Sequence, residues 1–298
     1  MKRARFIYNP TSGKEEVKKQ LPQLLDILES YGLETSVHAT KGHGDATKAA
    51  EEAVKRGFDL VIAAGGDGTL YEVINGLAPY ENRPALGIIP AGTTNDFARA
   101  LGIPRDFKKA ATIIGEQHSK AIDIGRFNDK YFINIAGGGT FTELTYEVPS
   151  KLKTVLGQLA YYVRGLEKLP FLKPIHITIE SEGQHFEEEA MLFLFANSNS
   201  VGGFEKLAPM ADLSDGLADV IIMKKTNLAD FVRIATLALK GDHLNDPHIV
   251  HFKANKLKIY SHNEEQVLIN LDGELGGVLP GEFEVLPRHI NVIMKKEK

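Results

Sequence analysis

The chain has 298 residues, of which 43% are hydrophobic and 25% charged, so it can bury a sizeable core and is not globally disordered. Its 35 Lys and Arg residues against 39 Asp and Glu give a formal net charge of -4, which excludes a broad electrostatic surface for nucleic acid. The absence of cysteine excludes disulfides, thiolate zinc sites, iron–sulfur clusters and cysteine nucleophiles. The chemistry must therefore come from carboxylates, hydroxyls, amides, His, Lys or a bound ion.

No segment has the pattern of a membrane span or a signal peptide. The longest apolar stretch, residues 190–196, is far short of the ~20 residues needed to cross a bilayer. The apolar run that follows the basic residues at positions 2, 3 and 5 is interrupted by Asn9-Pro10. We therefore expect a cytoplasmic protein that meets lipid only from the aqueous side.

The first part of the chain alternates short apolar runs with longer amphipathic ones. Strands are predicted at residues 5–8, 34–39, 59–63 and 86–89, and helices at 15–31, 45–56, 70–77 and from residue 97. The run at 59–63 is apolar throughout, as expected of a strand that is covered on both faces. This alternation predicts an α/β domain with a parallel, helix-covered sheet.

From about residue 121 the chain becomes mostly strand-like. Strands are predicted at 121–124, 131–135, 175–180, 190–195, 218–223, 256–260, 266–271 and 290–294, with helices at 151–169 and 228–239 and a hairpin turn at 182–184. We therefore predict an α/β nucleotide-binding domain over residues 1–125 and a mainly antiparallel, β-sandwich-like domain over 126–298. The extreme C-terminus can pack back on the first domain.

Three glycine-bearing loops follow strands of the predicted parallel sheet: residues 9–13, 65–69 and 90–96. Ligands of such sheets bind beyond the carboxyl ends of the strands, where glycine lets backbone N–H groups approach phosphate oxygens. One such loop can simply be a tight connection, but three on adjacent strands favour a phosphate site. They match neither the P-loop nor the dinucleotide-binding fingerprint. Asp67 lies between glycines and would repel phosphate unless a cation intervenes, so it predicts magnesium, with Asp96 as a second candidate.

These residues carry a family resemblance. Gly65-Gly66-Asp67-Gly68-Thr69 and the segment from Pro90 to Arg99 resemble the diacylglycerol kinase catalytic domain, which is related to sphingosine kinases and more distantly to NAD kinases. The resemblance extends over nearly the whole chain, through Val201 to Phe204, residues 212–217 and residues 271–274. One departure is Tyr71, where the family more often has Asn, which puts the nucleotide contacts at this position in doubt.

The resemblance implies a nucleotide-binding set of residues, in which Thr40 depends mainly on the resemblance. The set comprises Asn9, Pro10, Thr11, Ser12, Gly13, Thr40, Gly65, Gly66, Asp67, Gly68, Thr69, Leu70, Tyr71, Glu72 and Thr93. Asp67 and Asp96 would organise the catalytic magnesium.

Two further acidic segments lie in the second domain. Asp212 and Asp215 share one tight loop, which suits a hard cation or is an ordinary solvated turn. The resemblance implies a structural magnesium held by Asp212, Asp215 and the Leu217 carbonyl. Glu274 follows an apolar strand, and the resemblance makes it the base that takes the proton of a lipid hydroxyl. The alternative is a simple Asp-Gly turn with Glu274 in water.

Residues 151–173 combine five basic side chains and one Glu with an apolar stripe. This composition is typical of a helix on an anionic membrane surface, or of one that packs on the second domain with a solvated basic face.

We therefore expect an ATP- and magnesium-dependent kinase that converts 1,2-diacylglycerol to phosphatidic acid in phospholipid metabolism, with its active site in the interdomain cleft. We expect transient, peripheral membrane association, no nucleic-acid partner and a homodimer, the last from the resemblance. The alternatives are a kinase for another substrate (a sphingoid base, phosphatidylglycerol or NAD), or a non-catalytic nucleotide-binding regulator.

Overall fold

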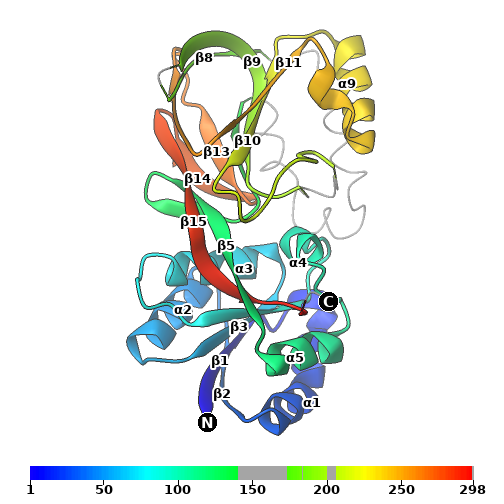
Figure 1. Ribbon diagram of the computed structural model, residues 1–298, viewed down its shortest axis with the longest axis vertical. Coiled ribbons are helices and arrows are strands. Elements are labelled where there is room, and N and C mark those ends of the chain that lie inside the picture. The colour runs from blue at the N-terminus through cyan, green and yellow to red at the C-terminus, as the bar shows by residue number, and fades with distance from the viewer. Residues whose placement is uncertain (140–172, 183, 200–205, 297–298) are drawn as a thin grey trace. The chain divides into compact units, whose positions relative to one another are not determined.

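The computed structural model describes residues 1–139, 173–182, 184–199 and 206–296 (Figure 1). The chain forms two compact units, Met1–Ile124 with Pro287–Lys298, and Gly125–Leu286. It passes between the units within β5 (Ser119–Phe127) and again within β15 (Gly281–Ile293). The first unit is built on parallel strands and the second on antiparallel ones, which confirms the predicted fold class.

The sheet of the first unit has four neighbouring parallel strands in the order β4-β3-β1-β2. Their bounds are Lys2–Tyr8 for β1, Leu33–Ala39 for β2, Leu60–Gly65 for β3 and Ala85–Pro90 for β4. The end of β15 joins β4 in parallel, with Val292 opposite Leu86. All six residues of β3 are buried, because the strand has neighbours on both sides and helices above and below it.

Two pairs of helices pack in this unit: α1 (Glu16–Ser30) against α5 (Phe107–Glu116), and α2 (Asp45–Lys55) against α3 (Asp67–Leu77). Gly76 of α3 permits the second contact, since a Cβ there would collide with the Thr47 carbonyl of α2. The helix predicted from residue 97 is only α4 (Asp96–Ala100), because Gly102 (φ 65) and Pro104 follow it. The sequence reading missed α5.

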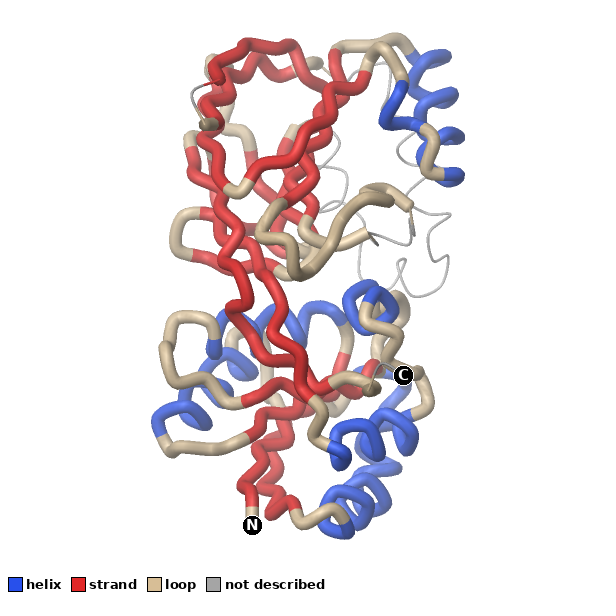
Figure 2. Tube along the Cα trace, in the orientation of Figure 1, coloured by secondary structure: helices blue, strands red, loops and turns tan. Residues whose placement is uncertain are grey.

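In the second unit, most of the described secondary structure is strand (Figure 2). The long strand β9 (Gln184–Ala196) organises it, since its first half pairs with β8 (Ile175–Ser181) and its second half with β7 (Ile135–Gly138) and β10 (Ala218–Lys224). Ser181 pairs with Gln184, which confirms the predicted hairpin. The other strands are β6 (Lys130–Phe132), β11 (Ile249–Ala254), β12 (Lys256–Ser261), β13 (Leu268–Leu271) and β14 (Glu274–Val278).

The core of the second unit has an aromatic part and an aliphatic part. The ring of Phe283 lies between 4.7 and 5.9 Å from the rings of Phe127, Phe193 and Phe195, measured between centroids. Helix α9 (Leu228–Lys240) contributes Ile234 to a separate buried cluster with Ile221 of β10. Asn227 caps the first turn of α9 by accepting a hydrogen bond from the Asp230 N–H.

Two predicted elements differ from the structure or lie outside its described part. The strand predicted at 131–135 is interrupted between β6 and β7, because the amide groups of residues 133–135 bind the carboxylate of Asp272 instead of a neighbouring strand. The helix predicted at 151–169 lies outside the described residues, as does the segment from Val201 to Phe204.

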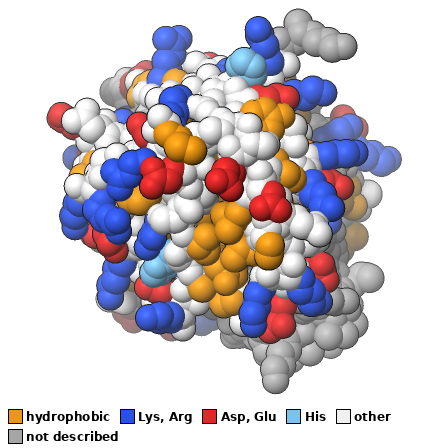
Figure 3. All heavy atoms as spheres, turned by 90° about the horizontal axis from the view of Figure 1, so that it is seen from below, with side chains coloured by type: hydrophobic (Ala, Val, Ile, Leu, Met, Phe, Trp, Pro, Cys, Tyr) orange, Lys and Arg blue, Asp and Glu red, His pale blue; other side chains and the backbone are white. Residues whose placement is uncertain are grey.

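The described residues contain no helix long and apolar enough to cross a membrane. On the face shown in Figure 3, Lys and Arg side chains are interspersed with Asp and Glu around a group of hydrophobic side chains. This face therefore has no broad field of positive charge, in agreement with the charge balance of the sequence.

Candidate active site

The carboxyl ends of the parallel strands bring the predicted loops together. The Asn9 N–H after β1 donates to Ala64 of β3 at 3.1 Å, and the Ala91 N–H after β4 donates to Gly65 at 2.8 Å. The Thr40 N–H after β2 donates to Tyr8 at 2.9 Å. The three glycine-bearing loops and Thr40 therefore adjoin one another at one edge of the sheet.

Glycine is required where two of these loops meet. A Cβ on Gly92 would lie 2.6 Å from the Cα of Gly66, so the backbones of the second and third loops are in direct contact. A Cβ on Gly13 would lie 2.6 Å from the Ala91 carbonyl oxygen, and Gly13 has φ 57. The loops thus form a cradle whose lining includes main-chain groups, which is the arrangement that phosphate oxygens need.

Asp67 and Asp96 form the acidic centre of this edge. Burial raises the pKa of Asp67, and the neighbouring carboxylate of Asp96 raises it further. Asp96 is 8% exposed and forms an ion pair with Arg99. Two hard oxygen donors beside a phosphate cradle fit magnesium, because a divalent cation would offset the repulsion that raises the pKa of Asp67.

Asn95 is a positioning residue that the sequence reading missed. Its side-chain Oδ1 accepts from the Gly92 N–H at 2.9 Å and its Nδ2 donates to the Gly92 carbonyl at 2.7 Å. Its own N–H donates to Oδ2 of Asp67 at 2.9 Å, and its φ is 51. An Asn directly before a helix-starting Asp is a signal that could have identified it, because Asn tolerates the left-handed conformation better than most residues.

A small hollow lies at this edge beside the acidic centre. Asp67 and Asn95 line it together with Ala63, Gly65, Gly66, Leu70, Ile88, Pro90 and Ala98. Arg105, also missed in the sequence, fixes the third loop by donating to the carbonyls of Thr93 and Thr94 at 3.0 Å each.

Residues 69–72 lie in helix α3, directly after the second glycine-bearing loop. Thr69, Leu70 and Tyr71 are each 8% exposed or less, so helix α3 is largely buried here. The carboxylate of Glu72 accepts hydrogen bonds from the N–H groups of Gly44 at 2.8 Å and Ala46 at 3.0 Å. Glu72 therefore caps helix α2 from a neighbouring helix and holds the segment that follows Thr40.

The first loop is shaped by Asn9. Its side-chain Oδ1 accepts from both the N–H (3.0 Å) and the hydroxyl (2.8 Å) of Thr11, and its carbonyl accepts from the Ser12 N–H at 3.2 Å. Thr11 and Gly13 remain exposed, so the loop is accessible to a ligand.

The acidic loop of the second unit, which contains Asp212 and Asp215, is paired with the positively charged side chain of Lys253. Asp215 Oδ1 accepts from the Leu217 N–H at 3.0 Å, while its Oδ2 lies 2.7 Å from the Lys253 ammonium group. Asp212 accepts from the N–H and hydroxyl of Ser214. Among the described residues, no group of three or more His, Asp or Glu side chains is arranged to hold a metal ion. The oxygen donors of this loop suit a hard cation, but Asp215 must share its charge with Lys253.

Glu274 is the first residue of β14 and is half-buried. It pairs with Leu271 across the turn formed by Asp272 and Gly273. The hairpin therefore places Glu274 at the end of a strand, next to the turn.

Comparison with known proteins shows what this chain resembles. The family described as "Diacylglycerol kinase catalytic domain" matches residues 3–127, and that described as "YegS C-terminal NAD kinase beta sandwich-like domain" matches residues 144–294. A diacylglycerol kinase of Bacillus subtilis (strain 168) is 62% identical over 100% of this chain and 98% of its own length. One of Staphylococcus aureus (strain MRSA252) is 52% identical over 98% and 92%.

A crystal structure of a diacylglycerol kinase from Bacillus anthracis str. Sterne superimposes with a TM-score of 0.83 and 32% identity, covering 99% of this chain and 97% of that one. The chain belongs to the diacylglycerol kinase family.

Membership of the diacylglycerol kinase family confirms the resemblance drawn from the two glycine-containing motifs. Those motifs lie at the sheet edge where Asn95 joins them, within the part matched by the family's catalytic domain. The second unit corresponds to the sandwich-like domain that is also named for NAD kinase, in keeping with the distant relationship expected from the sequence. Most of the basic segment at 151–173 lies outside the described residues.

Proposed function

We propose that this member of the diacylglycerol kinase family transfers the γ-phosphoryl group of ATP to the free hydroxyl of 1,2-diacylglycerol, giving phosphatidic acid and ADP. The observation that carries the proposal is the pairing of Asp67 and Asp96 within a cradle of glycine loops, in a chain 62% identical to a diacylglycerol kinase. The reaction would return diacylglycerol to phospholipid synthesis.

In this proposal the nucleotide phosphates bind the main-chain groups of residues 9–13, 65–69 and 93, with Thr40 at the side. Asp67 and Asp96 would hold magnesium, which when bound neutralises charge on the phosphates. Asn95 keeps the Asp67 carboxylate in position, and Arg99 neutralises part of the charge of Asp96. Glu72 takes part indirectly, through the segment it caps.

Glu274 is the proposed base, which accepts the hydroxyl proton as the phosphoryl group arrives. Its support is its half-buried position at a sharply defined turn, together with the family resemblance at residues 271–274.

The acidic loop is the proposed site of a structural magnesium, held by Asp212, Asp215 and the Leu217 carbonyl. Its support is a set of oxygen donors in one short turn. Lys253 pairs with the same Asp215 carboxylate and would compete with the metal for it.

Because the proposed substrate is a membrane lipid, we also propose transient contact of a cytoplasmic enzyme with the membrane, through residues 151–173. The support is their net charge of +4, from five basic residues and one Glu, together with their apolar stripe. Pelleting with anionic and neutral vesicles tests this, with the five basic residues changed to Glu as the comparison; equal weak binding throughout would reject it. The family resemblance supports a homodimer, which sedimentation equilibrium tests.

The deciding experiment is phosphoryl transfer from labelled ATP to a panel of lipids, run beside Glu274→Ala. We expect diacylglycerol to be labelled by the parent protein and labelling to fall at least 100-fold in the variant, with ATP binding retained. Preferred labelling of a sphingoid base or phosphatidylglycerol would assign a different substrate. Nucleotide binding without transfer to any lipid would favour a regulator.

A further inference from the structure

Asp272 holds three consecutive amide groups of a distant segment. Its Oδ2 accepts from the Ile133 N–H at 2.7 Å, and its Oδ1 accepts from Asn134 at 2.8 Å and Ile135 at 3.0 Å. The Asp272 N–H in turn donates to the Ile135 carbonyl at 3.0 Å. The residue is thus fastened through both its side chain and its main chain to the connection between β6 and β7.

That connection is itself fixed from the other side. The carbonyl of Asn134 accepts from the N–H groups of Asn197 at 2.8 Å and Ser198 at 3.2 Å, directly after β9. The Asn197 side chain donates to the Ile133 carbonyl at 2.8 Å. Asn134, Asn197 and Ser198 are 4%, 0% and 1% exposed, so Asp272 is anchored on a buried, hydrogen-bonded part of the second unit.

The geometry of the turn alone does not explain why residue 272 is an Asp. Asp272 (φ 51) and Gly273 (φ 97) both have positive φ, as two-residue hairpin turns of type I′ require, and Asn satisfies that requirement as well as Asp does. The Gly273 N–H is held by the side chain of Asn270 at 2.8 Å. The three hydrogen bonds from the N–H groups of residues 133–135 are therefore an additional feature. A carboxylate has enough acceptor sites for all three.

We propose that Asp272 is the positioning residue for Glu274. Glu274 follows the clamped turn by one residue, so the direction of its side chain depends on where Asp272 is held. Three N–H donors bind the Asp272 carboxylate, as expected of a side chain that fixes the backbone rather than one that accepts a proton. A displacement of about 1 Å can lower a rate roughly 100-fold, which gives the clamp a function beyond stability. This inference rests on the proposed role of Glu274 as the base.

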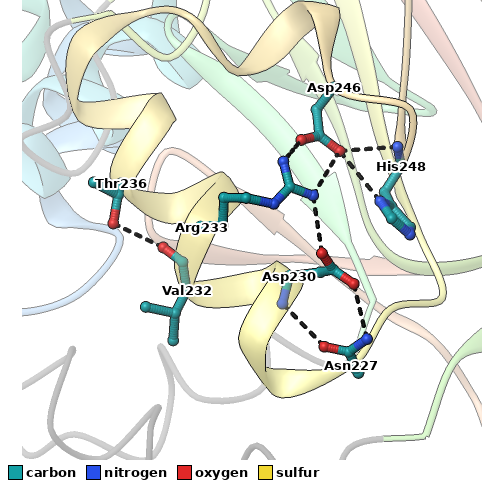
Figure 4. Close-up of polar contacts among 7 residues, drawn as sticks. All are labelled: Asn227, Asp230, Val232, Arg233, Thr236, Asp246 and His248. Carbon is teal, nitrogen blue, oxygen red and sulfur yellow. Dashed lines mark hydrogen bonds and ion pairs between the residues drawn. The ribbon is translucent and has the colours of Figure 1, made fainter.

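The first test compares Asp272→Asn with Asp246→Asn in the full chain. Asp246 is a matched control, since it is also a carboxylate of the second unit that accepts a main-chain N–H, from His248 at 3.0 Å, and it binds Arg233 of α9 (Figure 4). Asn at position 272 would place an NH2 group against an N–H donor. We expect both variants to melt at lower temperature, but only Asp272→Asn to lose kcat, by about 10- to 100-fold, with KM for ATP within twofold of the parent.

A double variant separates positioning from an independent effect. Asp272→Asn should slow a Glu274→Ala protein no more than twofold further, because there is no carboxylate left to position. If the double variant instead loses kcat by the product of the two single losses, the proposal is overturned. It is also overturned if Asp272→Asn has normal kcat while Glu274→Ala is inactive. Normal turnover in Glu274→Ala would overturn the base assignment and the positioning role together.

If Asp272→Asn does not fold, Gly273→Ala decides the question. A Cβ at position 273 meets none of the described atoms within 4 Å, so this variant changes only the backbone preference of the turn. We expect it to fold and to lose kcat at least fivefold. Unchanged kcat in Gly273→Ala would overturn the proposal.

Discussion

The main-chain N–H of Asn95 donates to Oδ2 of Asp67 over 2.9 Å, which joins the third glycine loop to the carboxylate of the second. The side chain of Asn95 bonds both the N–H and the carbonyl of Gly92, at the point where Gly92 touches Gly66. One residue in the left-handed conformation therefore sets the distance between two loops and the position of Asp67.

Substitutions of Asn95 should separate its two contributions. Asn95→Gly keeps the positive φ but removes the two side-chain hydrogen bonds, which should lower the free energy of unfolding by about 1–3 kcal/mol. Asn95→Ala should cost about 1–2 kcal/mol more, because Ala does not favour positive φ. Both should lower kcat/KM for ATP about tenfold or more. Urea unfolding and initial rates check this, and parental values in both variants would contradict it.

Asp67→Asn should stabilise the protein at neutral pH in the absence of magnesium. The pKa of Asp67 is raised above its ordinary 3.8 in the fold, mainly by burial. Its contribution to stability is therefore fully present below about pH 3.8 and is lost as the pH rises through the raised pKa. The variant should melt higher than the parent at pH 7, by a margin that shrinks toward pH 4, while its turnover falls at least 100-fold.

Asp45→Asn is a control in the same unit, for which we expect the opposite change in melting temperature. The Lys41 N–H lowers the pKa of Asp45 below its ordinary 3.8 by hydrogen bonding to its carboxylate. Its stabilisation is present above about pH 3.8 and is lost as the pH falls through the lowered pKa, so Asp45→Asn should melt lower than the parent at pH 7. Melting curves from pH 4 to 8 measure both variants, and equal shifts of the same sign would refute the assignment.

Glu72→Gln tests whether this residue caps α2 or binds the nucleotide directly. Gln retains one acceptor for the Gly44 and Ala46 N–H groups and turns an NH2 toward the other. A cap should therefore lose about 1–3 kcal/mol of unfolding free energy and change KM for ATP less than threefold. A tenfold rise in KM with unchanged stability would show direct contact. Unfolding curves and ATP saturation curves together decide between these outcomes.

Local patterns in the sequence were enough to predict the loops of the first unit. The apolar strand at 59–63 and the glycines after it predict a covered strand and a close backbone approach without reference to distant residues. The strand ends also place Thr40 beside Asn9, because all four strands run in parallel.

Contacts between residues far apart in the chain could not be predicted from the sequence. Glu72 is part of the glycine-loop motif, yet its carboxylate binds amides 26 and 28 positions away. The strand predicted at 131–135 is divided by Asp272, which is 137 to 139 positions away. In both cases a side chain binds main-chain N–H groups, and no periodicity in the sequence encodes which ones. Lys253 likewise reaches the acidic loop from 38 positions away, but by donating from its ammonium group to the carboxylate of Asp215.

Lys253 and magnesium should compete for Asp215. Burial opposes the charge of Lys253, but its hydrogen bond to Asp215 and the charges of Asp219, Asp215 and Asp212 outweigh this and raise its pKa. Lys253→Met frees Oδ2 of Asp215, so the variant should be less stable than the parent without divalent cations and gain more stability from magnesium. Saturation at 100 times Kd adds about 2.7 kcal/mol to the free energy of unfolding.

The measurement is thermal unfolding against magnesium concentration, made in an Asp67→Asn background so that the nucleotide edge does not contribute. Lys256→Met is the matched control, since Lys256 also pairs with a carboxylate, that of Glu282 at 2.7 Å, but away from the acidic loop. We expect its magnesium response to equal that of the background protein. Adding Asp215→Asn should abolish the response altogether. A response that Lys253→Met leaves unchanged would show that the ammonium group and the metal do not share this carboxylate, and a response that survives Asp215→Asn would place the metal elsewhere.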